Sequence, residues 1–138
     1  MDVVELGDTD EGPVVALWTS SNLTRPWNSP AIDYRRAVSG PTSAVLGVRE
    51  TGKIVATVMV GHDGHRGWMY YLAVHRDRRR RGYGTRLVSA AEAWLRDHGA
   101  PKVQLMVRSE NASVLNFYRG RGYENEDVRV LSRRLEDS

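Results

Sequence analysis

Short runs of apolar residues separated by turn residues predict a series of β-strands in the first half of the chain. Residues 44–49 and 53–60 are two such runs, and Glu50-Thr51-Gly52 between them is a typical hairpin turn. Residues 68–74 form the next run, after the glycine-rich turn 61–67. Three consecutive strands joined by short links predict an antiparallel meander.

Apolar residues at helical spacing predict four helices, at residues 10–18, 32–38, 87–95 and 111–121. Further strand candidates cover residues 3–6, 102–107 and 128–131. The unit from residue 68 to residue 107 therefore reads as strand, helix, strand. The two strands of such a unit are expected to be parallel, with a right-handed crossover.

The composition is that of one globular domain covering residues 1–138. Apolar residues make up 41% of the chain and charged residues 27%, which predicts a real core under a charged surface. No apolar run is long enough to span a membrane, and the first residues lack the basic region of a signal peptide. The chain has no cysteine, which excludes disulfides and thiolate metal sites. We therefore expect a cytoplasmic protein.

Positive charge is concentrated in one segment. The formal net charge is +3, and residues 76–81 alone contain five arginines. A basic cluster of this kind suits nucleic acid, an acidic membrane or a phosphorylated cofactor, and does not choose among them. A basic run can equally be an ordinary solvated face.

The basic segment lies between a predicted strand and a predicted helix, at Arg79-Arg80-Arg81-Gly82-Tyr83-Gly84. A turn in this place presents backbone N–H groups and a helix N-terminus to an anion, which makes it a candidate phosphate cradle. Gly82 and Gly84 have no Cβ, so a phosphate can approach the backbone closely. The segment is neither a Walker loop nor the dinucleotide fingerprint, since it lacks the residues that each requires.

A second segment, residues 111–123, supports a functional interpretation of the basic turn. Together the two segments resemble those of the GNAT acetyltransferases. Arg79, Gly82 and Gly84 match that family's signature Gln/Arg-x-x-Gly-x-Gly/Ala. The later family element is matched by Asn111, Tyr118, Gly122 and Tyr123, whereas Val114 stands where a small residue is frequent. Residues 23–28 and 62–67 further resemble a small bacterial single-domain subgroup, the YpeA type.

This resemblance implies the GNAT fold, an α/β (α+β) architecture. It has a mixed sheet of about six to seven strands, about four flanking helices and a splayed pair of parallel strands. It also implies acetyl-CoA as co-substrate, with the pantetheine arm along the exposed edge of the strand 68–74 and the diphosphate on the basic turn. The implied cofactor-binding residues are Leu72, Ala73, Val74, Arg79, Arg80, Arg81, Gly82, Tyr83, Gly84, Thr85, Asn111, Asn116 and Tyr118.

The chemistry that the resemblance implies is transfer of an acetyl group to a primary amine. Tyr118 matches the family's general acid, which protonates the departing thiolate; a packed core tyrosine is the alternative. Asn111 is a cofactor contact or a helix N-cap. No carboxylate lies in residues 68–74, so His62 and Asp63 are the nearest catalytic base candidates. A plain hairpin is the alternative for these residues, and they do not establish a metal site.

The expected acceptor wall consists of Arg25, Trp27, Asn28 and His65. The acceptor itself, a protein or a small-molecule amine, is not readable from the sequence, and a homodimer stays open. Two other functions are weighed against an N-acetyltransferase. Some members of the family carry a glutamate early in the strand before the basic turn, at or near the position of Trp68. Its absence here keeps open the first alternative, a non-catalytic acetyl-CoA sensor. The other is a basic nucleic-acid-binding module, which leaves residues 111–123 unexplained.

Overall fold

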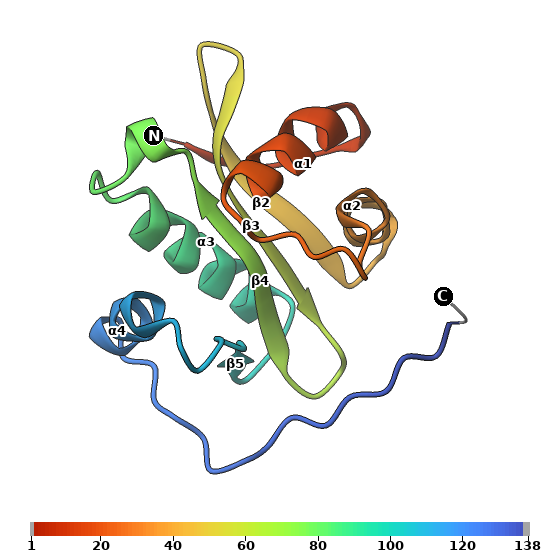
Figure 1. Cartoon of the computed structure of the whole chain (residues 1–138), viewed down its shortest axis with the longest axis vertical. Helices are drawn as coiled ribbons and strands as arrows, with labels where there is room; N and C mark the ends of the chain where they lie inside the picture. The colour runs from red at the N-terminus through yellow and green to blue at the C-terminus, as the bar shows by residue number, and fades with distance from the viewer. Residues whose placement is uncertain (1, 137–138) are drawn as a thin grey trace. The chain divides into compact units, whose positions relative to one another are not determined.

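The computed structural model describes residues 2–136 of the chain. They divide into two compact units, Met1–Leu105 and Met106–Ser138. The first unit contains a β-sheet with helices on both faces, and the second contains one helix followed by an extended segment (Figure 1). Each unit is described separately below.

The sheet of the first unit has five strands in the order β1-β2-β3-β4-β5. The first four are antiparallel, which confirms the predicted meander, and β5 runs parallel to β4 as the strand–helix–strand unit predicts. Their bounds are Val3–Glu5, Ser43–Glu50, Lys53–His62, Gly67–Val74 and Val103–Gln104. The expectation of six to seven strands is therefore too high for the described residues.

The four predicted helices are confirmed, at Glu11–Ser20 (α1), Pro30–Ser39 (α2), Tyr83–Asp97 (α3) and Ala112–Gly120 (α4). Two short 3-10 helices also form, at Asp8–Asp10 (η1) and Arg76–Arg78 (η2). Local capping explains where α2 begins. The Ser29 side chain accepts a hydrogen bond from the Ile32 N–H, and Pro30 occupies a first-turn position where it needs no N–H partner.

The sheet buries a different set of side chains on each face. On one face α1 and α2 pack over a core built around Trp18 and Tyr34, both fully buried. On the other face α3 buries Leu87, Val88 and Leu95. Figure 1 shows α3 on the side of the sheet opposite α1 and α2. This two-sided packing places the central strand, β3, between both cores.

The strand predicted at residues 128–131 does not form, and this prediction was wrong. Residues 121–136 contain no strand, and Val128, Val130 and Leu131 are exposed by 71%, 64% and 93%. A strand needs a hydrogen-bonding neighbour, and the described part of the second unit holds only α4. Alternation of apolar residues therefore does not suffice here.

The described residues include no helix long and apolar enough to cross a membrane.

Candidate functional site

The strands β4 and β5 pair over two residues only. Gly67 lies opposite Val103 and Trp68 opposite Gln104, while β4 continues to Val74. Among the described residues, positions 69–74 therefore have no β5 partner on this edge. An unpaired edge presents a row of N–H and C=O groups that an extended ligand can pair with. Because β5 consists of Val103–Gln104 and pairs over its full length, the predicted splaying of the parallel strands stays a prediction.

A β-bulge interrupts β4 along this open edge. Between the pairs Thr57–Ala73 and Met59–Tyr70, β4 has one residue more than β3. Tyr71 sits in this bulge with φ of 53°, a left-handed conformation that non-glycine residues seldom adopt. Met59 and Tyr71 both pack against the α1–α2 core, and Tyr70 pairs with Met59. The bulge thus turns two consecutive tyrosines to the same face of the sheet.

Packing and hydrogen bonds hold the bulge in place. The Tyr71 ring stacks on Trp18 with 3.9 Å between ring centroids, and its hydroxyl donates to the Asp33 carboxylate at 2.7 Å. Asn28 Nδ2 donates to the same Asp33 oxygen at 2.8 Å. Burial, and then the hydrogen bond to Asp33, raise the pKa of Tyr71 to about 12. These contacts offset the cost of the strained backbone and connect the loop after α1 to β4.

The basic turn joins η2 to α3, as predicted. Gly82 is the residue before α3 and has φ of 84°, and Arg80 has φ of 65°. No side chain caps the start of α3, and its first turn carries no acidic residue. The N–H groups of a helix's first turn lack partners within the helix and favour an anion. The start of α3 is therefore a place where an anion would be favoured, and the phosphate cradle stays a prediction.

The basic turn contains three consecutive arginines, and one of them already donates a hydrogen bond within the chain. Arg79, Arg80 and Arg81 are exposed. Arg79 Nε donates to the Val74 carbonyl at 3.3 Å, so one carbonyl of the open edge already has a donor. Exposed guanidinium groups beside free N–H groups suit a phosphate ligand.

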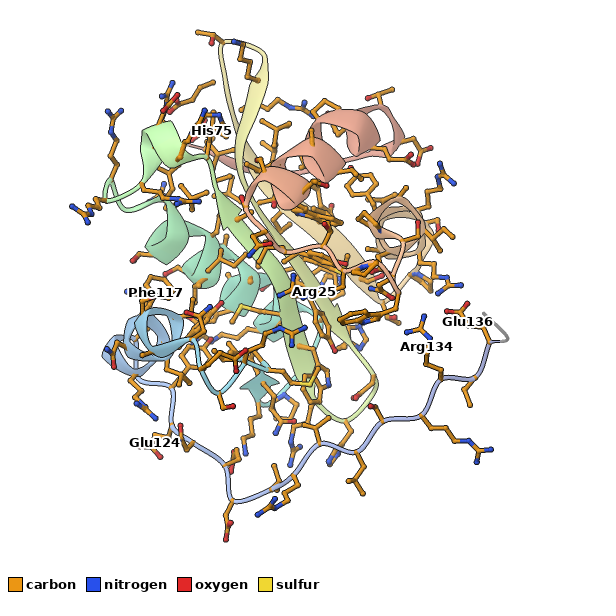
Figure 2. The ribbon with its side chains drawn as sticks, in the orientation of Figure 1. Arg25, His75, Phe117, Glu124, Arg134 and Glu136 are labelled. Atoms are coloured by element: carbon orange, nitrogen blue, oxygen red, sulfur yellow. The ribbon has the colours of Figure 1, made fainter. Side chains whose placement is uncertain are left out.

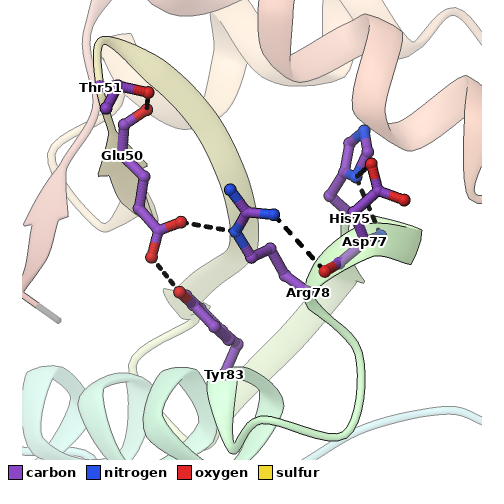
Figure 3. Close-up of polar contacts among 6 residues, drawn as sticks. All are labelled: Glu50, Thr51, His75, Asp77, Arg78 and Tyr83. Atoms are coloured by element: carbon purple, nitrogen blue, oxygen red, sulfur yellow. Dashed lines mark hydrogen bonds and ion pairs between the residues drawn. The ribbon is translucent and has the colours of Figure 1, made fainter.

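Glu50, at the end of β2, contacts the residues on both sides of the turn (Figure 3). Its carboxylate accepts a hydrogen bond from Arg78 Nε at 2.6 Å and another from the Tyr83 hydroxyl. The Arg78 hydrogen bond first, and then that from Tyr83, hold the pKa of Glu50 below its ordinary value. Tyr83, predicted as a cofactor contact, therefore has its side chain buried and engaged with Glu50. Only its backbone stays available to a ligand.

The predicted acceptor wall lies in the loop between α1 and α2, on the face of the sheet that Tyr71 occupies. Arg25 curls back on this loop, because its Nη1 donates to the carbonyls of Asn22 and Thr24 (Figure 2). Trp27 is exposed by 57%. Asn28 is held by Asp33, as described above. These residues share one face, whereas His65 lies exposed in the β3–β4 hairpin.

The structure separates the two candidate bases. The His62 ring faces α3, with centroids 6.0 Å from Trp94 and 5.8 Å from His98. It therefore lies on the face opposite the α1–α2 loop. Asp63 caps the hairpin instead, where its carboxylate accepts hydrogen bonds from the backbone N–H groups of Arg66 and His65 at 2.7 and 2.9 Å.

Asp63 also contacts Trp68, the first residue of the segment 68–74, which contains no carboxylate. The Trp68 indole N–H donates to Asp63 at 3.1 Å. The bonds from Arg66, His65 and Trp68, in that order, lower the pKa of Asp63 to about 2. A carboxylate of such low basicity is a poor proton acceptor near neutral pH. We infer that Asp63 stabilises the hairpin.

Replacing Asp63 by Asn tests this assignment. Asn keeps an oxygen acceptor for the two backbone N–H groups. We therefore expect turnover to change by less than about twofold, and the pH dependence of turnover near neutral pH to stay the same. The Asp63 carboxylate contributes stability above the ordinary pKa of Asp, and this contribution is lost as the pH falls towards 2. The variant should lack that acid-dependent loss. A drop in turnover of about 100-fold or more would instead make Asp63 the base.

The second segment of the family resemblance, residues 111–123, contains α4. Asn111 is the N-cap of α4, and its side-chain oxygen accepts from the Val114 N–H at 3.3 Å. This favours the capping interpretation of Asn111. Tyr118 is buried, with its ring edge-on to Phe117 and Tyr123, and burial raises its pKa to about 12. Its hydroxyl therefore stays protonated and able to donate near neutral pH. Asn116 is exposed on α4.

A comparison with known protein families identifies the family of this chain. The model of the acetyltransferase (GNAT) family matches residues 13–123. The chain belongs to the GNAT family. The match begins in α1 and runs through α4, so it includes both segments on which the sequence resemblance rests.

Relatives named as acetyltransferases match nearly the whole chain. An acetyltransferase of Yersinia enterocolitica is 39% identical over 135 residues, which are 98% of this chain and 96% of the relative. An acetyltransferase of Yersinia pseudotuberculosis has the same identity and coverage. The predicted family is confirmed by these relatives and by the family model.

Solved structures with the same fold have little sequence in common with this GNAT chain. An aminoglycoside N-acetyltransferase in complex with CoA is 14% identical with a TM-score of 0.83, over 97% of this chain and 94% of that one. A ribosomal-protein-alanine N-acetyltransferase from Brucella melitensis is 18% identical with a TM-score of 0.77, over 96% and 98%. At these identities the likeness establishes the fold.

Sequence reasoning missed three residues of the site, namely Glu50, Asp33 and Tyr71. Each acts through a partner that is distant in sequence, and no local pattern reports such pairs. Of these three residues, only Tyr71 has a sequence signal, because a bulge can place two consecutive bulky residues on one face of a sheet. The sequence shows Tyr70 and Tyr71 side by side, but two adjacent tyrosines also occur in regular strands.

Proposed function

We propose that this GNAT protein is an N-acetyltransferase that transfers the acetyl group of acetyl-CoA directly to a primary amine. The observation that carries the proposal is the basic turn at the start of α3, which follows a β4 strand whose residues 69–74 have no β5 partner among the described residues. This turn carries the family signature at Arg79, Gly82 and Gly84. The CoA complex of the aminoglycoside enzyme of the same fold supports acetyl-CoA as the co-substrate.

The binding mode follows from the groups that the first unit offers. The diphosphate lies on the N–H groups that follow Gly82, where the dipole of α3 favours negative charge. Arg79, Arg80 and Arg81 add attraction to phosphate. The pantetheine arm runs along β4 and pairs with backbone groups of residues 72–74 as an added strand would. The α1–α2 loop then borders the acceptor.

In the proposed reaction a neutral amine attacks the acetyl carbonyl carbon, and the new C–N bond replaces the C–S bond. An alkyl amine is mostly protonated near neutral pH, so a base must first take its proton. The departing thiolate receives a proton, which we assign to the hydroxyl of Tyr118 on the basis of the family motif. Its raised pKa, about 12, keeps the proton available until the thiolate forms. We propose that water relays the amine proton to solvent, and we assign no residue as the base.

The acceptor is proposed as a primary amine of a protein or a small molecule. Two neighbours of the same fold illustrate both classes, because one is named for aminoglycosides and the other for the alanine of a ribosomal protein. We also propose that the whole chain works as one acetyltransferase domain of the YpeA type in the cytoplasm. Two alternatives stay open. A non-catalytic sensor needs no base and so agrees with the fact that none is assigned, whereas a nucleic-acid-binding module accounts only for the exposed arginines of the basic turn.

An acceptor screen tests the proposed function. We expect release of CoA thiol from acetyl-CoA when a panel of peptides, polyamines and aminoglycosides is added, with the acceptor gaining the mass of one acetyl group. Acetyl-CoA binding without thiol release by any amine of a broad panel would favour the sensor. Binding of duplex DNA in place of acetyl-CoA would favour the nucleic-acid module.

A further inference from the structure

The basic turn is poorly able to hold its own shape. Residues 79–82 are exposed and belong to no helix or strand. Two of them, Arg80 and Gly82, have left-handed backbone conformations. Three adjacent arginines also repel one another. A turn with these properties needs contacts from outside to keep its N–H groups directed at one point.

Glu50 supplies such contacts on both sides. Arg78 immediately precedes the turn and Tyr83 immediately follows it, and one carboxylate accepts hydrogen bonds from both side chains (Figure 3). Each of its two oxygens has one of these partners. The carboxylate thus spans the mouth of the turn and fixes the separation of its ends.

The support under Glu50 is stiff. Glu50 pairs with Lys53 at the end of the β2–β3 hairpin, and the two residues between them, Thr51 and Gly52, have φ of 49° and 78°. Positive φ at both central positions is the geometry of a tight hairpin turn that matches the twist of its strands. The Thr51 hydroxyl also donates to the Glu50 carbonyl at 2.7 Å.

The charge of Glu50 has a further consequence. The side chains of Glu50 and Arg78 are each about one-third exposed, at 31% and 32%. Because Arg78 is paired with Glu50, its charge is largely offset before any ligand arrives. The turn therefore offers phosphate the three exposed arginines and the backbone, while Arg78 and Tyr83 serve to hold it.

We propose that Glu50 is a positioning residue for the diphosphate of acetyl-CoA, which acts by holding Arg78 and Tyr83 at the two ends of the basic turn. This inference rests on the proposed function. The role predicts a loss confined to ligands that carry the diphosphate. S-acetylpantetheine lacks that group and is expected to be insensitive to Glu50.

The test measures the affinity of acetyl-CoA by calorimetry and that of S-acetylpantetheine by NMR titration, neither of which needs a known acceptor. Glu50→Ala should weaken acetyl-CoA by about tenfold, the size of one charge-assisted hydrogen bond, and leave S-acetylpantetheine unchanged. Glu50→Gln retains an acceptor oxygen and a donor and should recover part of the loss. Tyr83→Phe removes one end only and should show a smaller loss, about threefold.

The matched control is Glu11→Ala. Glu11 forms a comparable carboxylate–guanidinium pair with Arg35, at 2.6 and 2.9 Å between α1 and α2, far along the chain from the turn. This variant should bind both ligands like the wild type. If Glu50→Ala weakens both ligands equally, Glu50 is a general structural residue and the inference is wrong.

Tighter binding of acetyl-CoA by Glu50→Gln at low salt, lost at high salt, would also overturn the inference. It would show that Glu50 only neutralises Arg78. A wild type that binds no acetyl-CoA would remove the proposed function itself. A wild type that binds and a Glu50→Ala variant that binds equally well would remove only the inference.

Discussion

Gly82→Val is expected to abolish measurable binding of acetyl-CoA. Gly82 has φ of 84°, which costs a residue with a Cβ about 1–2 kcal/mol and a β-branched residue more. No atom lies within 4 Å of a Cβ placed there, so the penalty comes from the backbone conformation. We expect position 82 to avoid this penalty by leaving its left-handed backbone conformation. The N–H groups of the turn then no longer converge on the diphosphate. Each charged hydrogen bond lost weakens binding by about 10- to 150-fold, so the loss of two or more takes a micromolar affinity beyond the measurable range.

The matched control for this variant is Gly99→Val. Gly99 follows α3 at its far end, has φ of 80° and likewise has no atom within 4 Å of a Cβ. Both variants should therefore lose similar stability in thermal unfolding. Calorimetry on the folded proteins should find normal acetyl-CoA affinity for Gly99→Val alone. Normal affinity in Gly82→Val would show that the diphosphate binds elsewhere.

Tyr118→Phe is expected to lower turnover by about 100-fold or more with acetyl-CoA affinity nearly unchanged, because general acid catalysis contributes about 10²–10⁴-fold. The hydroxyl is proposed to act on the departing sulfur, an interaction that strengthens as the thiolate forms. The phenylalanine ring keeps the edge-on contacts with Phe117 and Tyr123. Stability should therefore change little.

The comparison for Tyr118→Phe is Tyr123→Phe, which removes a neighbouring hydroxyl from the same unit and should leave turnover within about twofold of wild type. Turnover and acetyl-CoA affinity are measured on the same preparation, with the acceptor that the amine screen returns. Unaltered turnover in Tyr118→Phe would return Tyr118 to the core. Equal losses of turnover and affinity would make it a binding residue.

Most of the first unit could be predicted from the sequence because its signals are local. The alternating runs around Thr51 and Gly52 fix a hairpin, and the order strand, basic turn, helix fixes where the Gly82 turn lies. These patterns depend on the alternation of side chains along a strand and on the backbone freedom of glycine. Both can be recognised from residues that are close together in the sequence.

The failures have a common cause, since they concern pairing between distant residues. Residues 128–131 alternate like a strand, but a strand forms only against a partner, and none lies in the described part of the second unit. Asp63 is a different case, because the donors that lower its pKa are near it in sequence and converge on its carboxylate only in the folded hairpin. Its role stays a prediction. Glu50 gave no signal, because its role requires Arg78 and Tyr83, which are 28 and 33 residues away.

The most direct test of the central claim is a calorimetric titration of the wild-type protein with acetyl-CoA, accompanied by thermal unfolding with and without the ligand. The account predicts one acetyl-CoA per chain, a dissociation constant on the order of micromolar and a higher melting temperature. At 100 times the dissociation constant, the ligand should add about 2.7 kcal/mol to the free energy of unfolding. No heat of binding and no thermal shift at saturating acetyl-CoA would contradict the account.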